Sequence, residues 1–290
     1  MKNQHSKHLF QLCLATLFIS TSGPLAKYID LSPPIIIWWR CVLAMIFLYI
    51  YCRYRKTSLK IKSKKDIVTF IIGALFLGAH WITYYYALKL SNVALGMLSL
   101  YTYPVITALL EPLFIKVKLD PIHILLGMMV ILGIYILAPD FDIENSHVKG
   151  VLLGLLSALL YAVRILMLKQ HIAIYNGSML MFYQVFILTI VLLPVIFLMD
   201  STGIQGQLPS LVFLALISTV IGHTMMVQSF KHFAVSTSSI ISSAHPVYGI
   251  IIAYFLLNEI PNWNTFIGGM LILSTVIIEG IRSKKTFNKG

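Results

Sequence analysis

Charged residues are scarce in this chain of 290 residues and make up only 11% of it. Soluble domains carry roughly 25%, so an ordinary soluble fold is excluded. Acidic residues are scarcer still, with 10 Asp and Glu against 22 Lys and Arg. The three cysteines, Cys13, Cys41 and Cys52, lack the spacing of a zinc site or of a disulfide framework. We therefore expect no metal and no other cofactor.

Long apolar runs are abundant instead. Apolar residues make up 58% of the chain, and the mean hydropathy is +0.86. A helix needs roughly 20 apolar residues to cross the hydrocarbon core. Runs of this kind span Leu9–Ala26, Pro34–Tyr51, Ile67–Leu88, Val93–Ile115, Ile122–Ala138, Val148–Leu168, Ser178–Leu198, Leu208–Phe230, Val235–Leu257 and Trp263–Ile281. We predict an all-α membrane protein with ten transmembrane helices, and we interpret the first run as a retained span rather than a cleaved signal.

The basic residues are distributed unevenly between the two ends of the predicted spans. If the N-terminus is cytoplasmic, only Lys27, Lys89 and Lys149 fall outside, while the segment 53–65 and both termini are rich in Lys and Arg on the inside. The positive-inside rule then places both termini in the cytoplasm. The same distribution makes nucleic acid a poor partner and the lipid bilayer the expected one. Whether the chain forms a homodimer is left open.

An internal repeat divides the chain into two halves. One constant shift lays Lys27 on Lys169, Pro104 on Pro246 and Gly127 on Gly269. The halves, 9–138 and 148–281, each hold five predicted spans, and an odd number of spans inverts the second copy relative to the first. Inverted repeats are an architecture of secondary transporters, whose substrate site lies near the midplane between the repeats.

Two long segments carry a family resemblance. They are "YYYALKLSNVALGMLSLYTYPVITALLEPLF" and "SFKHFAVSTSSIISSAHPVYGIIIAYFLLNEIPNWNTFIGGMLIL", together with the basic residue Arg40 early in the second span. With them the chain resembles the drug/metabolite transporter superfamily, specifically its EamA-type ten-helix members. The turn glutamate of that family is present as Glu259 but is missing from the first half, where Glu111 lies inside the helix instead. The resemblance implies a multi-pass inner-membrane carrier that moves small metabolites, often amino acids and often outward.

Polar side chains interrupt the ninth span in the stretch "STSSIISSAHPVYG", residues 236–249. Ser242, His245 and Gly249 share one helix face, and Pro246 lacks the N–H that would bond a carbonyl one turn earlier. Serines also allow close helix packing, which is the alternative interpretation. The repeat shift lays Pro104 on Pro246, so we predict a weakened helix at the same depth in both halves.

Histidine and aromatic residues at similar depth complete a predicted substrate site. Hydrocarbon offers no partner to a polar group, so these groups should face the protein interior or a cavity. Tyr85 and Tyr86, nearer the outer end, are expected to join an aromatic belt instead. The predicted substrate-binding residues are His80, Trp81, Tyr84, Tyr101, Tyr103, Tyr161, His223, Ser242 and His245.

Three ionisable residues lie within predicted spans, where a charge is costly and indicates function. For Arg40, two interpretations stay open: structural anchoring with the side chain reaching toward the interface, and binding of a substrate carboxylate. Glu111 and Arg164 fall toward the cytoplasmic side and are predicted either to pair or, for Glu111, to carry a proton.

Two classes of function are weighed here, and a structural or channel role stays open beside them. The favoured one is a secondary transporter, an exporter of small metabolites such as amino acids across the inner membrane by alternating access. The alternative is a membrane-embedded enzyme acting on a lipid or small amphipathic substrate. An enzyme needs a nucleophile with a base, a metal set or paired carboxylates, and none of these has a recognisable spacing here. We therefore predict that the protein is not an enzyme.

Overall fold

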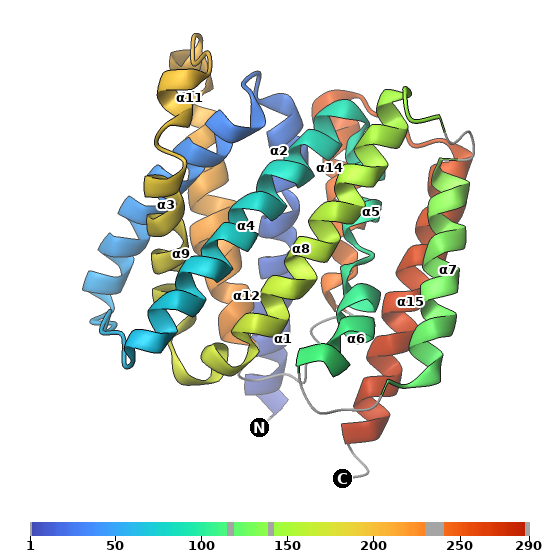
Figure 1. Ribbon diagram of the computed structural model, residues 1–290, viewed down its shortest axis with the longest axis horizontal. Helices are drawn as coiled ribbons and strands as arrows, with labels where there is room; N and C mark the ends of the chain where they lie inside the picture. Colours follow the sequence, from blue (N-terminus) through green and yellow to red (C-terminus); the bar gives the residue numbers. More distant parts are fainter. Residues whose placement is uncertain (1, 115–118, 139–141, 230–240, 288–290) are drawn as a thin grey trace.

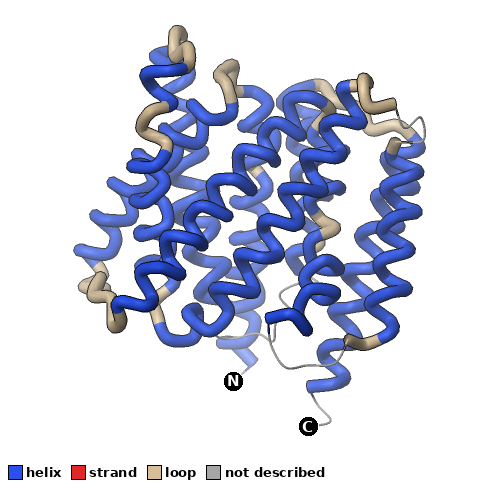
Figure 2. The backbone as a smooth tube through the Cα atoms, viewed as in Figure 1, coloured by secondary structure: helices blue, strands red, loops and turns tan. Residues whose placement is uncertain are grey.

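The computed structural model describes residues 2–114, 119–138, 142–229 and 241–287, and these residues form a bundle of helices. The first half contains α1 (Lys2–Ser20), α2 (Ser22–Tyr28), α3 (Pro33–Tyr54), α4 (Lys64–Leu90), α5 (Val93–Leu100), α6 (Tyr103–Phe114) and α7 (Pro121–Leu137). The second contains α8 (Ser146–Ile174), α9 (Gly177–Val191), α10 (Val195–Leu198), α11 (Ile204–Phe213), the π-helix η1 (Leu214–His223), α12 (Thr224–Ser229), α14 (Ala244–Leu257) and α15 (Trp263–Phe287). Figure 2 shows helices joined by short loops throughout the described part.

Seven helical segments in the described ranges are long and apolar enough to cross a membrane. Three shorter apolar helices accompany them: Pro121–Leu137, Ala244–Leu257 and Trp263–Glu279. Lipid offers no hydrogen-bond partners to the backbone, and helices satisfy their backbone groups internally. The prediction of an all-α membrane protein is confirmed.

Capping residues fix where several of the helices begin. The side chains of Ser63, Asn92, Asn145 and Asn176 each accept a hydrogen bond from a backbone N–H in the first turn of α4, α5, α8 and α9. Such caps satisfy N–H groups that have no partner within the helix. Asp120 caps α7 in the same way, and a proline follows it at the first helical position.

Both chain ends and the basic turn 55–63 between α3 and α4 lie at the same end of the bundle, the lower end in Figure 1. We call this the basic end and the other the opposite end. Because both chain ends lie at the same end, the chain crosses the bundle an even number of times, as ten transmembrane helices require. That the basic end faces the cytoplasm stays a prediction.

The short helices α5 and α14 pack against each other, nearer to the opposite end of the bundle than to the basic end. All eight residues of α5 are buried. Gly249 of α14 lies so close to Met97 of α5 and to the Ser20 carbonyl of α1 that a Cβ atom there would overlap the Met97 side chain. In α6, by contrast, only Val105 is fully buried. The first half of the chain is therefore packed tightly to the second at this level.

Candidate functional site

Aromatic and imidazole rings from both halves form a continuous chain of contacts in the middle of the bundle. His245 of α14 stacks on Tyr101, with ring centroids 5.2 Å apart, and Tyr101 contacts Tyr103 at 5.5 Å. Tyr103 of α6 meets Tyr161 of α8 edge to face at 4.9 Å, and Tyr161 stacks on His80 of α4 at 4.7 Å. The ring chain thus crosses between the repeats three times.

The same chain continues along α4. His80 and Tyr84, one turn apart, lie 6.3 Å apart with nearly parallel rings, and Tyr84 contacts Tyr85 at 5.9 Å. On the neighbouring stripe, the Trp81 ring lies 6.1 Å from the ring of His223 at the end of η1. We call the following set the ring cluster: His80, Trp81, Tyr84, Tyr101, Tyr103, Tyr161, His223 and His245. The structure brings these predicted residues together, whereas substrate binding by them stays a prediction.

The orientation of His80 is fixed by Ser157 of α8. The Ser157 hydroxyl donates its one proton to the His80 carbonyl at 2.8 Å, and it lies 2.7 Å from His80 Nδ1. Because that proton is already used, Nδ1 must donate to the serine oxygen. A neutral His80 therefore carries its lone pair on Nε2.

Both halves have a break in a helix at equivalent positions. Between α5 and α6 the break falls at Tyr101 and Thr102, and α14 begins after a turn at Ser243. In a regular helix the Ser242 carbonyl would accept from the residue four positions on, which is Pro246 and has no N–H. The Tyr101 hydroxyl donates to that carbonyl at 2.6 Å instead. One repeat thus satisfies the group that the proline of the other leaves open.

Arg40 of α3 is fully buried and bonded to hydroxyl groups. Its Nε donates to Thr219 Oγ1 at 2.7 Å, and Nη1 donates to Tyr85 Oη at 2.7 Å and to Ser22 Oγ at 3.3 Å. Nη2 donates to Ser218 Oγ at 3.4 Å. These bonds hold the side chain inside the bundle. Of the two interpretations left open for Arg40, a side chain that reaches toward the interface does not agree with the structure, because its described hydrogen-bond partners lie in the interior.

Among the described residues, no carboxylate balances the charge of Arg40. None of the ion pairs in the described part of the chain includes Arg40. Its Cζ atom lies 4.0 Å from the centroid of the Trp81 ring, which is a cation–π contact. Arginine has five N–H donors. The four bonds to hydroxyls of described residues use one of the two Nη2 donors, which leaves the other beside the ring cluster without a described partner.

Arg164 lies on α8 one turn from the ring cluster. Its Nη2 donates to Gln184 Oε1 of α9 at 2.5 Å, and its guanidinium lies 5.7 Å from the Tyr161 ring. Arg164 Nε is buried without a hydrogen-bond partner. Glu111 takes part in an interaction, and its predicted pairing with Arg164 stays a prediction.

Sequence reasoning missed the hydroxyl groups around Arg40. Ser22, Ser218 and Thr219 come from α2 and η1, and their polarity inside an apolar span was the only signal. Tyr85, predicted to belong to an aromatic belt, is fully buried and bonded to Arg40, so that expectation is wrong. π-Helical segments are frequent at functional sites, and η1 carries both Ser218 and Thr219.

At the opposite end, Glu259 in the turn between α14 and α15 contacts the first half of the chain. Its carboxylate lies 3.0 Å from Lys27 Nζ of α2 and accepts from the Val93 N–H of α5 at 2.7 Å. Lys27 also donates to the Ser91 carbonyl at 2.5 Å. Glu259 belongs to the second half and its partners belong to the first, so these contacts join the repeats.

Two pockets of the described residues lie toward opposite ends of the bundle. One of about 180 Å³ is lined by residues that include Asn92 and Glu259, at the opposite end. A larger one lies at the end of α3. Neither is lined by the ring cluster, so the predicted cavity within the cluster stays a prediction. Of the serine stretch 236–249, Ser238 and Ser239 lie outside the described residues.

Comparison with known proteins gives three findings. The EamA-like transporter family matches residues 6–138 and 148–279. The pseudopaline exporter CntI, from two strains of Pseudomonas aeruginosa, is 23% identical over 270 residues, which cover 91% of this chain and 92% of the exporter. A protein of known crystal structure, 18% identical, superposes with a TM-score of 0.68 over 97% of this chain and 99% of that one.

These findings agree with the fold. The family model covers both halves of the chain, each of which holds one copy of the broken helix. The similarity to the crystal structure supports the fold alone, because the sequence identity is low. The protein is a multi-pass inner-membrane transporter, and the chain belongs to the EamA-like transporter family of the drug/metabolite transporter superfamily.

Proposed function

We propose that this protein exports small carboxylate-bearing, amino-acid-like metabolites by alternating access, with the ring cluster as the substrate site. The two halves rock about the cluster, and the contacts of Glu259 close the opposite end in the conformation described here. Alternating access in transporters with inverted repeats commonly works in this way.

The observation that carries the proposal is the buried charge of Arg40. A charged group in a transmembrane segment is costly unless it is paired, and the described partners of Arg40 are neutral hydroxyls. A substrate carboxylate next to the remaining Nη2 donor would supply the missing negative charge. Charge-assisted bonds of guanidinium to carboxylate are the stronger class of hydrogen bond.

The broken helices give independent support. Transporter sites often use half-helices whose N-termini, the positive ends of the helix dipole, point at anionic substrate groups. α6 begins at Tyr103 and α14 begins at Ala244, so two such N-termini start next to the ring cluster. The rings themselves offer apolar faces and polar edges, which suit an amphipathic solute.

The outward direction is supported by the relative. CntI is an exporter, and the similarity extends over nearly the whole length of both proteins. A sequence identity of 23% supports the export of a small molecule, but it does not identify which molecule is exported.

A flux assay with purified protein in lipid vesicles tests the proposal. Each labelled amino acid is compared with its amide and with the amine that lacks the carboxyl group. We expect the carboxylate form to cross the membrane and the two analogues to cross at the rate of empty vesicles. Flux of all three forms alike would contradict the role of a carboxylate, and chemical conversion of the solute without flux would favour the membrane enzyme.

An Arg40→Gln variant refines this result, with Arg55→Gln as the matched control. Arg55 is exposed on the basic turn, at the basic end of the bundle. Arg40→Gln should lose carboxylate-dependent flux while Arg55→Gln keeps it. Equal flux through both variants would contradict the proposed role of Arg40, and the comparison of solutes on the unmodified protein holds even if Arg40→Gln folds poorly.

A further inference from the structure

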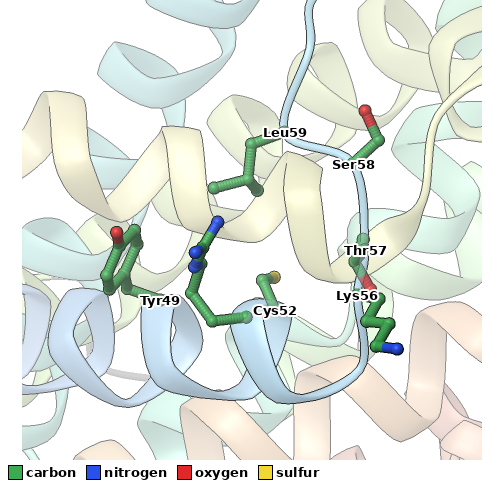
Figure 3. A pocket seen from close by; sticks show the side chains of 7 residues that line it. Tyr49, Cys52, Lys56, Thr57, Ser58 and Leu59 are labelled. Atoms are coloured by element: carbon green, nitrogen blue, oxygen red, sulfur yellow. The ribbon is translucent and has the colours of Figure 1, made fainter.

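One of the two described pockets lies away from the ring cluster, at the basic end of α3. It has a volume of about 670 Å³ and lies between the last turns of α3 and the chain that follows. Figure 3 shows Tyr49, Cys52 and Leu59 around its interior, with the turn of Lys56, Thr57 and Ser58 at its rim. Transport through the ring cluster gives this pocket no role.

The pocket carries positive charge without a described negative partner. Arg53 and Lys56 line it, together with the hydroxyl-bearing Thr57 and Ser58. Both cations are exposed, and the ion pairs of the described residues do not include either of them. Guanidinium, ammonium and hydroxyl groups together are the donors that bind phosphate oxygens.

The location of the pocket is at the level expected for lipid headgroups. Tyr49 and Tyr54 of α3 are exposed by 49% and 82%, and Ile46 and Ile50 on the same face are exposed by 45% and 58%. Aromatic residues at the end of an apolar helix mark the membrane–water interface. The end of α3 lies at the outer edge of the bundle in Figure 1. A lipid with its phosphate in the pocket could therefore lay its chains along the exposed apolar face of α3.

The chain around the pocket is held in place by α9 and by Tyr175, the residue that follows α8. Tyr183 of α9 donates its hydroxyl to the Leu59 carbonyl at 2.7 Å, and the Lys62 N–H donates to Tyr175 Oη at 2.9 Å. Tyr49 also contacts Phe182 of α9, with ring centroids 6.1 Å apart. The pocket is therefore formed before any ligand enters.

Lys56 occupies a backbone conformation that favours glycine. Its φ angle is +52°, and the Thr57 N–H bonds the Cys52 carbonyl across the end of α3 at 2.9 Å. Glycine is the usual residue at such a helix end. A lysine in this place is strained, and strain of this kind clusters at binding sites.

From these observations we propose that the pocket binds the phosphate headgroup of an anionic glycerophospholipid. Basic pockets at the cytoplasmic side of transmembrane helices bind such headgroups, and each Lys or Arg near the surface contributes about fivefold in affinity. Arg53 and Lys56 hold the phosphate, and Thr57 and Ser58 bond its oxygens. The bound lipid ties the basic end of α3 to the bilayer.

The test measures lipid retention by native mass spectrometry of the whole protein, with phosphatidylglycerol and phosphatidylcholine of equal chain length. Arg53→Gln and Lys56→Gly are compared with Arg55→Gln, which removes an exposed charge between them that does not line the pocket. We expect one tightly retained phosphatidylglycerol, bound about fivefold more weakly by each of the first two variants. Arg55→Gln should bind it as the unmodified protein does.

Glycine suits the backbone at position 56, so Lys56→Gly should melt at the same temperature as the unmodified protein or higher, which separates lost binding from lost folding. Equal weakening in all three variants would reduce the effect to diffuse charge attraction and overturn the site. Equal retention of both lipids would overturn it as well. Displacement of the lipid by millimolar glycerol phosphate or inorganic phosphate would assign the pocket to a free phosphate instead.

Discussion

Glu259→Gln should shift the protein toward a conformation that is open at the opposite end. The substitution keeps the shape of the side chain and an oxygen that can accept from the Val93 N–H, but it removes the negative charge. Lys27 loses its ion pair, and the first turn of α5 loses an anion at its N-terminus. Both interactions join the halves, so their loss favours separation at this end.

The magnitude follows from the two lost terms. The side chains of Lys27 and Glu259 are 24% and 20% exposed, so the pair is partly screened and contributes about 0.5–1 kcal/mol. A carboxylate at a helix N-terminus contributes about 0.5–1 kcal/mol more. The sum, about 1–2 kcal/mol, corresponds to a shift of about 5- to 30-fold in the ratio of open to closed molecules.

Spin labels provide the measurement. Tyr28 and Ile260 are exposed at the opposite end, on different halves, and can be replaced by labelled cysteines after the three native cysteines are removed. Pulsed dipolar spectroscopy should show a larger share of long distances in Glu259→Gln. Glu144→Gln is the control. It removes the exposed ion pair between Glu144 and Lys149 at the same end, and this pair does not join the two halves. Identical distance distributions in all three proteins would refute the reasoning.

Two further outcomes follow from the described contacts. Tyr101→Phe leaves the Ser242 carbonyl without its hydrogen-bond donor and should lower the free energy of unfolding by about 1–3 kcal/mol. The measurement is the melting temperature, which should fall in Tyr101→Phe but not in the control Tyr135→Phe, since Tyr135 is exposed. The Ile122 N–H and the Arg282 guanidinium hold the pKa of Asp120 below its ordinary value, so its stabilising effect is complete at neutral pH and is lost as the pH falls through that lowered pKa. Asp120→Asn should therefore lower the melting temperature at pH 7 and make the melting temperature depend less on pH in the acidic range.

The placement of the helix breaks and of the rings was accessible from the sequence for a physical reason. Proline removes a backbone donor wherever it stands, so Pro104 and Pro246 mark the breaks without knowledge of the packing. Residues that share a stripe on one helix, such as His80 and Tyr84, face the same neighbour. The repeat shift then aligns residues at equivalent depths in the two halves, and it aligned Trp81 with His223.

The environment of Arg40 was not accessible in the same way. Its acceptors come from α2, α4 and η1, and single hydroxyls in apolar spans have no periodic pattern. The π-helical turns of η1 follow a wider repeat than an α-helix, so a stripe drawn at α-helical spacing misplaces Ser218 and Thr219. Glu259 was recognised as a turn residue from the family resemblance, but its partners Lys27 and Val93 depend on how the two halves pack.

The central claim is that a carboxylate-bearing solute binds within the ring cluster, between the two halves. The most direct measurement is a structure of the protein with the solute that the flux assay identifies. We predict density for the solute in contact with rings of both halves, such as Tyr103 and Tyr161, with its carboxyl group next to Arg40. Density for the solute elsewhere, with the ring contacts of the cluster unchanged and Arg40 still bonded only to hydroxyls, would contradict the account.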